Sequence, residues 1–182
     1  MNWLKQFRQK HSLPSDFSHS ATQAFIPFAE HLVAKCTAKT SPQFVGINGC
    51  QGSGKSTLTR FLYEYLQSHH ALSVVTMSLD DYYLSRAQRT SLAENVHPLL
   101  QTRGTHDTAL LAHTLQSLAT GCDAIIPSFN KALDEPVPKS SWAKVTTKQD
   151  IIIVEGWCWG VMPQSALALK SPVNALEASK DA

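Results

Sequence analysis

The glycine-rich stretch GCQGSGKS, at residues 49–56, limits the possible folds more than any other feature of the sequence. The apolar run QFVGI at 43–47 precedes it, and apolar residues follow at spacings of three and four between Leu58 and Leu66. These patterns predict a buried strand, a tight loop and a helix over about residues 55–69. A strand joined to a helix by such a short loop is typical of α/β folds with a parallel sheet.

The spacing of this stretch, G-x-x-x-x-G-K-S, suits the binding of nucleotide phosphates. A polyanion needs several converging N–H donors, and glycines allow the backbone to approach it closely. The helix that begins near Lys55 adds the positive end of its dipole. We therefore expect Lys55 to reach the β- and γ-phosphates as a catalytic residue, and the Ser56 hydroxyl to bind Mg²⁺. The predicted nucleotide-binding residues are Gly49, Cys50, Gln51, Gly52, Ser53, Gly54, Lys55, Ser56 and Thr57.

Other apolar patterns extend this fold class along the chain. A helix is predicted over about 25–36, which Pro27 either starts or bends, and another over 108–120, which Gly121 ends. The prediction is a three-layer α/β/α P-loop NTPase fold with a mostly parallel sheet. The remaining predicted strands are 72–79, the short segment 124–126, and the fully apolar run at 151–154.

The composition fits one globular domain. The chain has 182 residues, of which 43% are hydrophobic, and a formal net charge of +2. Disordered chains combine low hydrophobicity with high net charge, so disorder is excluded for most of the chain. We assign residues 1–20 to a polar, loosely attached segment and residues 21–182 to the domain that carries the glycine-rich loop.

The same numbers bear on partners and compartment. A net charge of +2 provides no basic field for nucleic acid or an anionic membrane. No run of about 18 apolar residues exists, and the first residues do not resemble a signal peptide. The four cysteines lack the CxxC spacing of a zinc site and do not form a disulfide framework. We therefore predict a cytoplasmic protein, and the sequence does not indicate its oligomeric state.

Carboxylates stand where two of the predicted strands end. Asp80 and Asp81 follow the strand at 72–79, and Glu155 follows the strand at 151–154. Because parallel strands end at one edge of the sheet, we expect all three acids to face the glycine-rich loop. Phosphoryl transfer to an alcohol needs a base and acidic groups that hold Mg²⁺, which these residues could supply. A helix cap is the alternative role for each of them.

Four motifs together resemble a known family. They are NGCQGSGKST at 48–57, SLDDYYL at 78–84, HPLLQTRGTHD at 97–107 and IIIVEGWCWG at 151–160. The second is similar to the S-x-D-D-F-Y element of kinases related to uridine kinase, phosphoribulokinase and pantothenate kinase. In this order, the four resemble the D-glycerate 3-kinase family and its kinase-like relatives. The resemblance implies ATP-dependent phosphorylation of a small hydroxy acid such as D-glycerate, with Mg²⁺.

The resemblance also implies roles for single residues. Asp80 aligns with the catalytic base of the wider superfamily, and Tyr83 with an aromatic residue that contacts the acceptor. Glu155 takes the place of the acidic residue that is tied to Mg²⁺. Arg103 and His106 lie in the stretch that reaches the acceptor, and a guanidinium suits a carboxylate substrate. A solvated arginine and an ordinary loop histidine are the alternatives for these two.

Departures from the family pattern fall on the acceptor side. Asn130 stands where relatives usually carry Asp, the stretch ends with Lys131, and ALDEPVP replaces a basic, glycine-rich continuation. The segment around Arg103 is also shorter. Trp157 and Trp159 are expected either to line the acceptor pocket or to pack in the core. The acceptor alcohol is therefore less constrained by the sequence than the nucleotide.

Two hypotheses of function remain. The first is an ATP-dependent kinase that transfers the γ-phosphate to a hydroxyl of a small hydroxy acid. The second is a nucleotide-binding module, or a truncated kinase fragment without activity, because further strands and a basic lid follow the strand at 151–154 in this kinase class. On that comparison, the fold is expected to be incomplete at the C-terminus, with a bare sheet edge. The GTPase motif N-K-x-D and the ABC-type signature L-S-G-G-Q do not occur.

Overall fold

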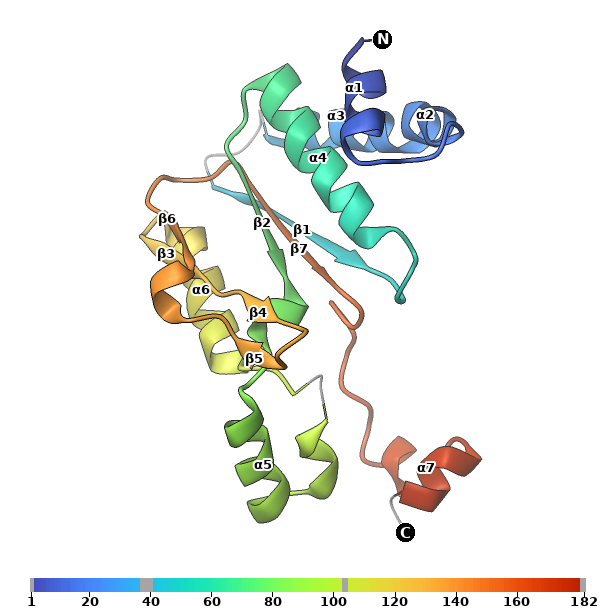
Figure 1. Cartoon of the computed structure of the whole chain (residues 1–182), viewed down its shortest axis with the longest axis vertical. Coiled ribbons are helices and arrows are strands. Elements are labelled where there is room, and N and C mark those ends of the chain that lie inside the picture. Colours follow the sequence, from blue (N-terminus) through green and yellow to red (C-terminus); the bar gives the residue numbers. More distant parts are fainter. Residues whose placement is uncertain (1, 37–40, 103–104, 181–182) are drawn as a thin grey trace.

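A parallel β-sheet forms the centre of the molecule (Figure 1). Strand β7 (Ile151–Gly156) lies between β1 (Gln43–Asn48) and β2 (Val74–Ser78), in the order β1-β7-β2. The first residues of the three strands are opposite one another, so the strands also end at one edge. The three predicted parallel strands are therefore confirmed. The computed structural model describes residues 2–36, 41–102 and 105–180.

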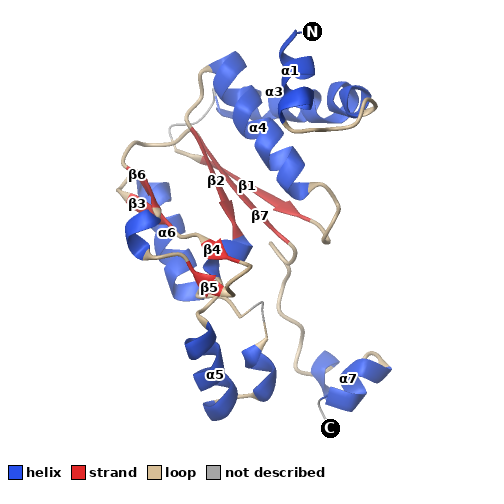
Figure 2. Cartoon of the chain, viewed as in Figure 1, coloured by secondary structure: helices blue, strands red, loops and turns tan. Residues whose placement is uncertain are grey.

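Strand β7 is buried on both faces, as its apolar run predicts. Its first four residues expose at most 1% of their surface. Ile151 and Ile153 pack with the side chains of α4 (Lys55–His70), and Ile152 and Val154 pack toward α6 (Thr108–Thr120). Figure 2 shows these two helices on opposite sides of the sheet. The three-layer α/β/α architecture is thus confirmed.

Pro27 and Gly121 take their predicted places in two of the helices. Helix α3 (Ile26–Cys36) has Pro27 in its first turn, where a missing N–H is tolerated, and follows a π-helical turn at Ala21–Phe25. Asp107 caps α6 by accepting a hydrogen bond of 2.8 Å from the Leu110 N–H. Gly121 ends the same helix with a φ of +71°, which favours glycine.

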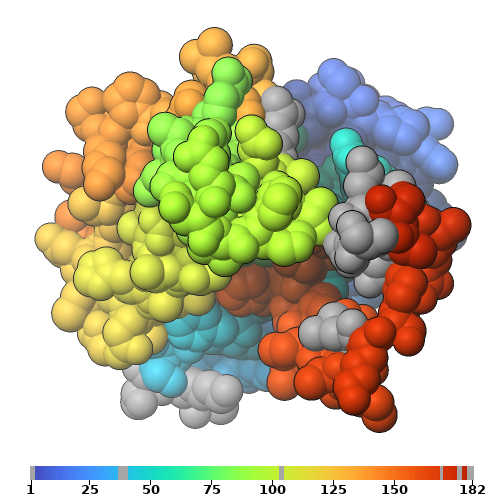
Figure 3. Space-filling model, turned by 90° about the horizontal axis from the view of Figure 1, so that it is seen from below, coloured from blue at the N-terminus to red at the C-terminus, as the bar shows by residue number. Residues whose placement is uncertain are grey.

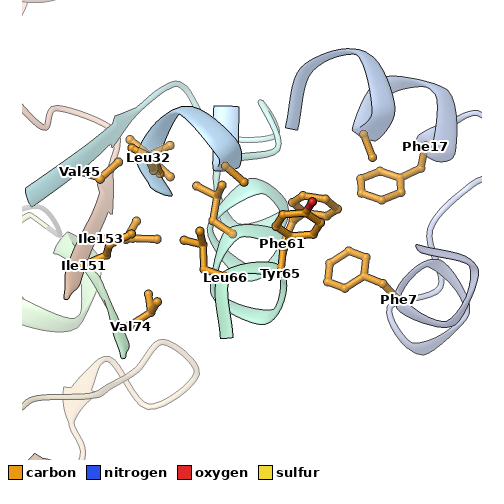
Figure 4. Close-up of a cluster of buried hydrophobic side chains, with 14 residues drawn as sticks. Phe7, Phe17, Leu32, Val45, Phe61, Tyr65, Leu66, Val74, Ile151 and Ile153 are labelled. Carbon is orange, nitrogen blue, oxygen red and sulfur yellow. The ribbon is translucent and has the colours of Figure 1, made fainter. Parts of the chain in front are cut away.

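The N-terminal segment packs closely against α4, so the prediction that residues 1–20 are loosely attached is wrong for the described residues. Helices α1 (Asn2–Lys10) and α2 (Phe17–Ser20) place Phe7 and Phe17 in the core, with 2% and 8% of their surfaces exposed. Figure 4 shows both rings pointing toward Phe61 of α4. A few aromatic residues among many polar ones suffice to bury one face of each short helix.

Several elements of the acceptor-side region have weak signals in the sequence. Helix α5 (Arg86–Asn95) is largely polar and begins at a capping box formed by Ser85 and Gln88. The short strand predicted at 124–126 exists, but it pairs antiparallel with another strand and does not join the central sheet. The other short elements are β3 (Ala124–Ile126), β4 (Phe129–Asn130), β5 (Glu135–Pro136), β6 (Ala143–Val145) and the 3-10 helices Leu79–Tyr82, Pro98–Gln101, Lys139–Ser141 and Ala168–Lys170.

The segment after Gly160 extends away from the sheet and carries α7 (Ala175–Lys180). Its described residues are largely exposed. Figure 3, seen from below relative to Figure 1, shows the α5 region in green and this segment in red projecting toward the viewer. No helix in the described part of the chain is long and apolar enough to cross a membrane.

Candidate functional site

The glycine-rich loop joins the end of β1 to the first turn of α4. Gly52 and Gly54 have φ values of +78° and +89°, which side chains other than glycine adopt only at a cost. A Cβ added to Gly49 would lie 2.6 Å from the Ser53 hydroxyl. The Gly49 N–H also donates a hydrogen bond of 3.3 Å to the carbonyl of Gly156, which fastens the loop to β7. The glycines are therefore required by the shape of the loop.

A cavity of about 820 Å³ opens over this loop and the ends of β7 and β2. It brings together the predicted residues Lys55, Ser56, Asp80, Tyr83 and Glu155, which come from separate parts of the sequence. Parallel strands end at one edge, so their following residues meet there. The full lining consists of Asn48, Gly49, Cys50, Gln51, Gly52, Lys55, Ser56, Asp80, Tyr83, Lys131, Glu155, Gly156 and Trp157.

Ser56 and Glu155 form the predicted metal-binding pair. The Ser56 hydroxyl donates a hydrogen bond of 3.1 Å to Glu155 Oε1. The described residues contain no group of three or more His, Cys, Asp or Glu side chains that could hold a metal ion. Mg²⁺ usually binds through one or two protein oxygens, waters and substrate phosphates, so one hydroxyl and one carboxylate fit it. This pair is suited to Mg²⁺ that arrives with a nucleotide.

Lys55 lies over the loop itself. Its Nζ atom donates a hydrogen bond of 3.0 Å to the carbonyl of Cys50. A lysine ammonium on a loop of backbone N–H groups adds a positive charge where phosphate oxygens would bind. The position of Lys55 therefore suits the predicted contact with the β- and γ-phosphates.

Asp80 lies across the cavity and is held by two donors. Its Oδ1 accepts a hydrogen bond of 2.8 Å from the Tyr83 hydroxyl, and its Oδ2 lies 2.6 Å from Lys131 Nζ. Burial acts to raise the pKa of Asp80, but the hydrogen bonds from Lys131 and Tyr83 outweigh it and lower the pKa. Asp80 is therefore ionised near neutral pH, as a general base must be.

Asp81 does not line the main cavity, but it lines a second, adjoining cavity of about 410 Å³ together with Ser56 and Glu155. Its Oδ1 accepts a hydrogen bond of 3.0 Å from the Phe129 N–H, at the start of the β4–β5 hairpin. Burial raises the pKa of Asp81 above its ordinary value. The contact instead fixes the hairpin against the end of β2.

Tyr83 and His106 are neighbours, but only Tyr83 reaches the main cavity. Their ring centroids lie 4.8 Å apart, and their backbones form an isolated antiparallel bridge. His106 Nε2 is buried and has no hydrogen-bond partner among the described residues, and burial lowers the pKa of this histidine. His106 therefore packs behind Tyr83. Arg103, the other predicted acceptor residue, lies outside the described residues.

The cavity also contains two residues to which sequence reasoning assigned no definite role. Lys131 comes from the β4–β5 hairpin and contacts Asp80, and its only signal in the sequence is its place beside Asn130. Trp157 is 53% exposed and lines the cavity. Trp159 instead packs against β1, where a Cβ on Gly46 would overlap its indole ring. Trp157 thus lines the cavity, whereas Trp159 packs in the core as the second expectation has it.

Comparison with known proteins places this geometry among kinases. No family model matches the chain. It is 38% identical over 140 residues to an uncharacterized kinase of Schizosaccharomyces pombe, an alignment that covers 70% of this chain and 50% of that protein. It is 32% identical over 126 residues to a uridine kinase of Alkaliphilus metalliredigens, covering 63% and 52%.

Solved structures agree with this placement. A D-glycerate 3-kinase from Cryptococcus neoformans superposes with a TM-score of 0.69 at 32% identity, over 80% of this chain and 56% of that chain. The chain spans about half the length of the curated relatives it matches. By sequence and by fold, the chain belongs to the P-loop kinases related to D-glycerate 3-kinase and uridine kinase.

Proposed function

We propose that the protein is an ATP-dependent kinase that transfers the γ-phosphate to a hydroxyl of a small hydroxy acid similar to D-glycerate. One observation carries this proposal: the ionised Asp80 and the Lys55–Ser56 phosphate loop line the same cavity. A phosphate cradle binds a nucleotide, and a base facing it adds the ability to activate an acceptor. The phosphate-binding loop and the proposed base therefore line the same cavity.

On the nucleotide side, the backbone N–H groups of the loop would surround the phosphates of ATP. Lys55 would exchange its hydrogen bond with the Cys50 carbonyl for one with phosphate oxygens. Ser56 and Glu155 would hold Mg²⁺. When bound, the metal neutralises charge on the β- and γ-phosphate oxygens.

On the acceptor side, Asp80 would take the proton of the reacting hydroxyl. The hydroxyl oxygen then forms a bond to the γ-phosphorus, the bond to the bridging oxygen of ADP breaks, and ADP leaves. Tyr83, fixed between His106 and Phe129 at ring distances of 4.8 and 5.4 Å, would keep Asp80 in place through its hydroxyl. The proton later returns from Asp80 to water.

Two observations support a small acid as the acceptor. The superposed D-glycerate 3-kinase covers 80% of this chain. The cavity is also lined by Lys131, whose positive charge suits an anionic group. The net charge of +2 gives no reason to propose nucleic acid.

A second candidate, a nucleotide-binding module without turnover, is favoured by the edge of the sheet. Strand β1 pairs with β7 on one side, pairs with no strand on its other side among the described residues, and has Phe44 46% exposed. Such a module would bind MgATP but would not form a phosphorylated product.

The test measures nucleotide binding and turnover on the same 182-residue chain. ATP, Mg²⁺ and D-glycerate should give ADP and phosphoglycerate, detected by phosphorus NMR, and uridine serves as the competing acceptor. Asp80→Asn should abolish turnover while MgATP binding by calorimetry persists. Asp123→Asn, at an exposed position, is the control. Binding without any product would favour the second candidate.

A further inference from the structure

Lys131 lies in a turn with a fixed backbone, and its exposed head group contacts Asp80. It follows β4 in the tight turn of the β4–β5 hairpin, where Asn130 Oδ1 accepts hydrogen bonds of 3.0 and 3.1 Å from the N–H groups of Ala132 and Leu133. Its side chain is 64% exposed, and its Nζ atom lies 2.6 Å from Asp80 Oδ2. The turn therefore fixes the backbone position of Lys131, but packing does not fix the position of its ammonium group.

The hairpin itself has anchors that do not involve Lys131. The Phe129 N–H donates to Asp81, and Asp134 Oδ2 lies 2.7 Å from a guanidinium nitrogen of Arg89. Arg89 is a residue of α5 that is only 1% exposed. Because these contacts hold the hairpin, the ammonium can leave Asp80 and still remain at the wall of the cavity.

An ammonium bonded to a carboxylate oxygen makes that oxygen a weaker base and leaves less room for an approaching hydroxyl. Tyr83 holds Oδ1 and Lys131 holds Oδ2. The Tyr83 ring is packed between two aromatic neighbours, whereas the lysine side chain is 64% exposed. Because the ammonium lies largely in water, screening weakens this ion pair on the lysine side. Of the two donors, Lys131 is therefore the one that can leave Asp80 more readily when a hydroxyl approaches.

Of the charged side chains that line the cavity, one cation is not assigned to the nucleotide and could bind the acceptor. Lys55 lies on the phosphate loop, and Glu155 is bonded to Ser56. Among the described lining residues, Lys131 is the remaining cation. We propose that Lys131 binds the carboxylate of the acceptor, and that it leaves Asp80 to do so, which frees the base only when an anionic acceptor is present. This inference rests on the proposed kinase function and adds a residue that selects the substrate.

The proton balance of the reaction stays the same. The acceptor hydroxyl gives its proton to the freed Asp80 Oδ2, its oxygen forms the bond to the γ-phosphorus, and ADP leaves with the bridging oxygen. Lys131 stays protonated throughout and exchanges one carboxylate partner for another. An acceptor without a carboxylate would have to displace Lys131 with no compensating ion pair.

The experiment compares D-glycerate with glycerol, which has similar hydroxyls but no carboxylate. The 182-residue chain, Lys131→Met, Lys144→Met and Arg103→Met are assayed for kcat/KM on both acceptors. D-glycerate binding in the presence of ADP and Mg²⁺ is measured by calorimetry. Lys131→Met should lower the glycerate-to-glycerol ratio about 10- to 100-fold, the size of one charge-assisted hydrogen bond, and should weaken glycerate binding similarly. Lys144→Met, at an exposed position on β6, should change neither value.

Other outcomes would overturn the proposal in distinguishable ways. Equal losses for both acceptors would mean that Lys131 serves Asp80 alone, and a fall in the ratio confined to Arg103→Met would assign the carboxylate to that arginine. A chain that phosphorylates glycerol or uridine but does not bind D-glycerate keeps its kinase function and loses this inference. If no acceptor is phosphorylated, the proposed function fails, but calorimetry still tests the contact between Lys131 and the carboxylate. Weaker D-glycerate binding by Lys131→Met than by the unchanged chain supports this contact, and the absence of D-glycerate binding by the unchanged chain refutes it.

Discussion

The Ser56 hydroxyl donates a hydrogen bond of 3.1 Å to Glu155 Oε1 and so joins the first turn of α4 to the end of β7. The two residues are 99 positions apart in the sequence. Their contact depends on the parallel order of β1 and β7, which brings the loop after one strand beside the last residues of the other. The metal-binding prediction therefore depends on the topology of the sheet as well as on the two side chains.

Glu155→Gln keeps the shape of this side chain but removes its charge. We expect the Mg²⁺ concentration required for half-maximal ATP binding to rise about 10-fold or more, because an interaction with a charged group is worth about 1.5–3 kcal/mol. Calorimetric titration with ATP at a series of Mg²⁺ concentrations measures the change. Glu94→Gln, an exposed substitution on α5, is the control. An unchanged Mg²⁺ dependence would remove Glu155 from the metal site.

Gly54→Ala tests whether the loop needs its left-handed residue. Gly54 has a φ of +89°, and a residue with a side chain costs roughly 1–2 kcal/mol in that region. Gly160→Ala is a matched control, because Gly160 also has a positive φ, of +78°, and open space around its Cα. Both variants should lose stability in urea titrations, whereas only Gly54→Ala should weaken ATP binding. Equal ATP affinities of the two variants would show that the loop tolerates the change.

Phe7→Ala tests whether the N-terminal helix is part of the core. Phe7 is 2% exposed and contacts Phe61 with ring centroids 5.3 Å apart. Deleting a buried phenylalanine ring usually costs about 3–5 kcal/mol, so the free energy of unfolding should fall by about that amount. Phe44→Ala, at a position that is 46% exposed, should cost much less. Similar losses for both would restore the idea of a loosely attached segment.

The central sheet and the phosphate loop could be predicted from the sequence because each has a strong local signal. The run IIIV is apolar at every position, since β7 is covered on both faces, and the loop's glycines and lysine have fixed spacings. Helix α1 has no comparable signal: its buried face depends on Trp3 and Phe7 meeting Phe61, which is 54 residues beyond Phe7. Contacts of that kind follow from tertiary packing and not from local pattern.

The acceptor side was predictable only in part for a similar reason. Asp80 and Tyr83 lie directly after a strong strand, so their place at the sheet edge follows from the strand. Lys131 reaches Asp80 through a two-residue strand and a turn, elements too short to leave a periodic pattern. Asp81 could not be separated from Asp80 by sequence, because its direction depends on the Phe129 N–H, which it binds across the fold.

Glu64 should make stability depend on pH in the acid range. Burial acts to raise the pKa of Glu64, but its contacts with Lys10 and His11, at 3.0 and 2.7 Å, outweigh it and lower the pKa from 4.5. A lowered pKa means that the stabilisation is present above pH 4.5 and is lost as the pH falls through the folded-state value. Glu64→Gln should therefore flatten the pH dependence of unfolding below about pH 5, whereas Glu94→Gln should not. Identical profiles would show that the contacts contribute nothing.

Asp134→Asn should destabilise the protein more than Arg89→Met, which removes the buried partner of Asp134. Asp134 lies 2.7 Å from Arg89 and 3.8 Å from Arg86, and the Arg89 side chain is 2% exposed. Within the part of the chain that the structure describes, the Nε and Nη1 atoms of Arg89 have no hydrogen-bond partner, so this cation is already incompletely compensated. Removing the carboxylate would leave it buried without its main counter-charge, at a cost of about 3–5 kcal/mol.

The matched variants of this ion pair separate burial from charge. Arg89→Met removes the buried cation and fills its space, leaving behind a carboxylate that is 15% exposed and still near Arg86, so its cost should be clearly smaller. Arg86→Met, at a side chain that is 64% exposed, should cost under about 1 kcal/mol. Urea unfolding of the three variants gives the order. If Arg89→Met were the most destabilising, the packing of its side chain, and not its charge, would be what holds α5 to the hairpin that carries Lys131.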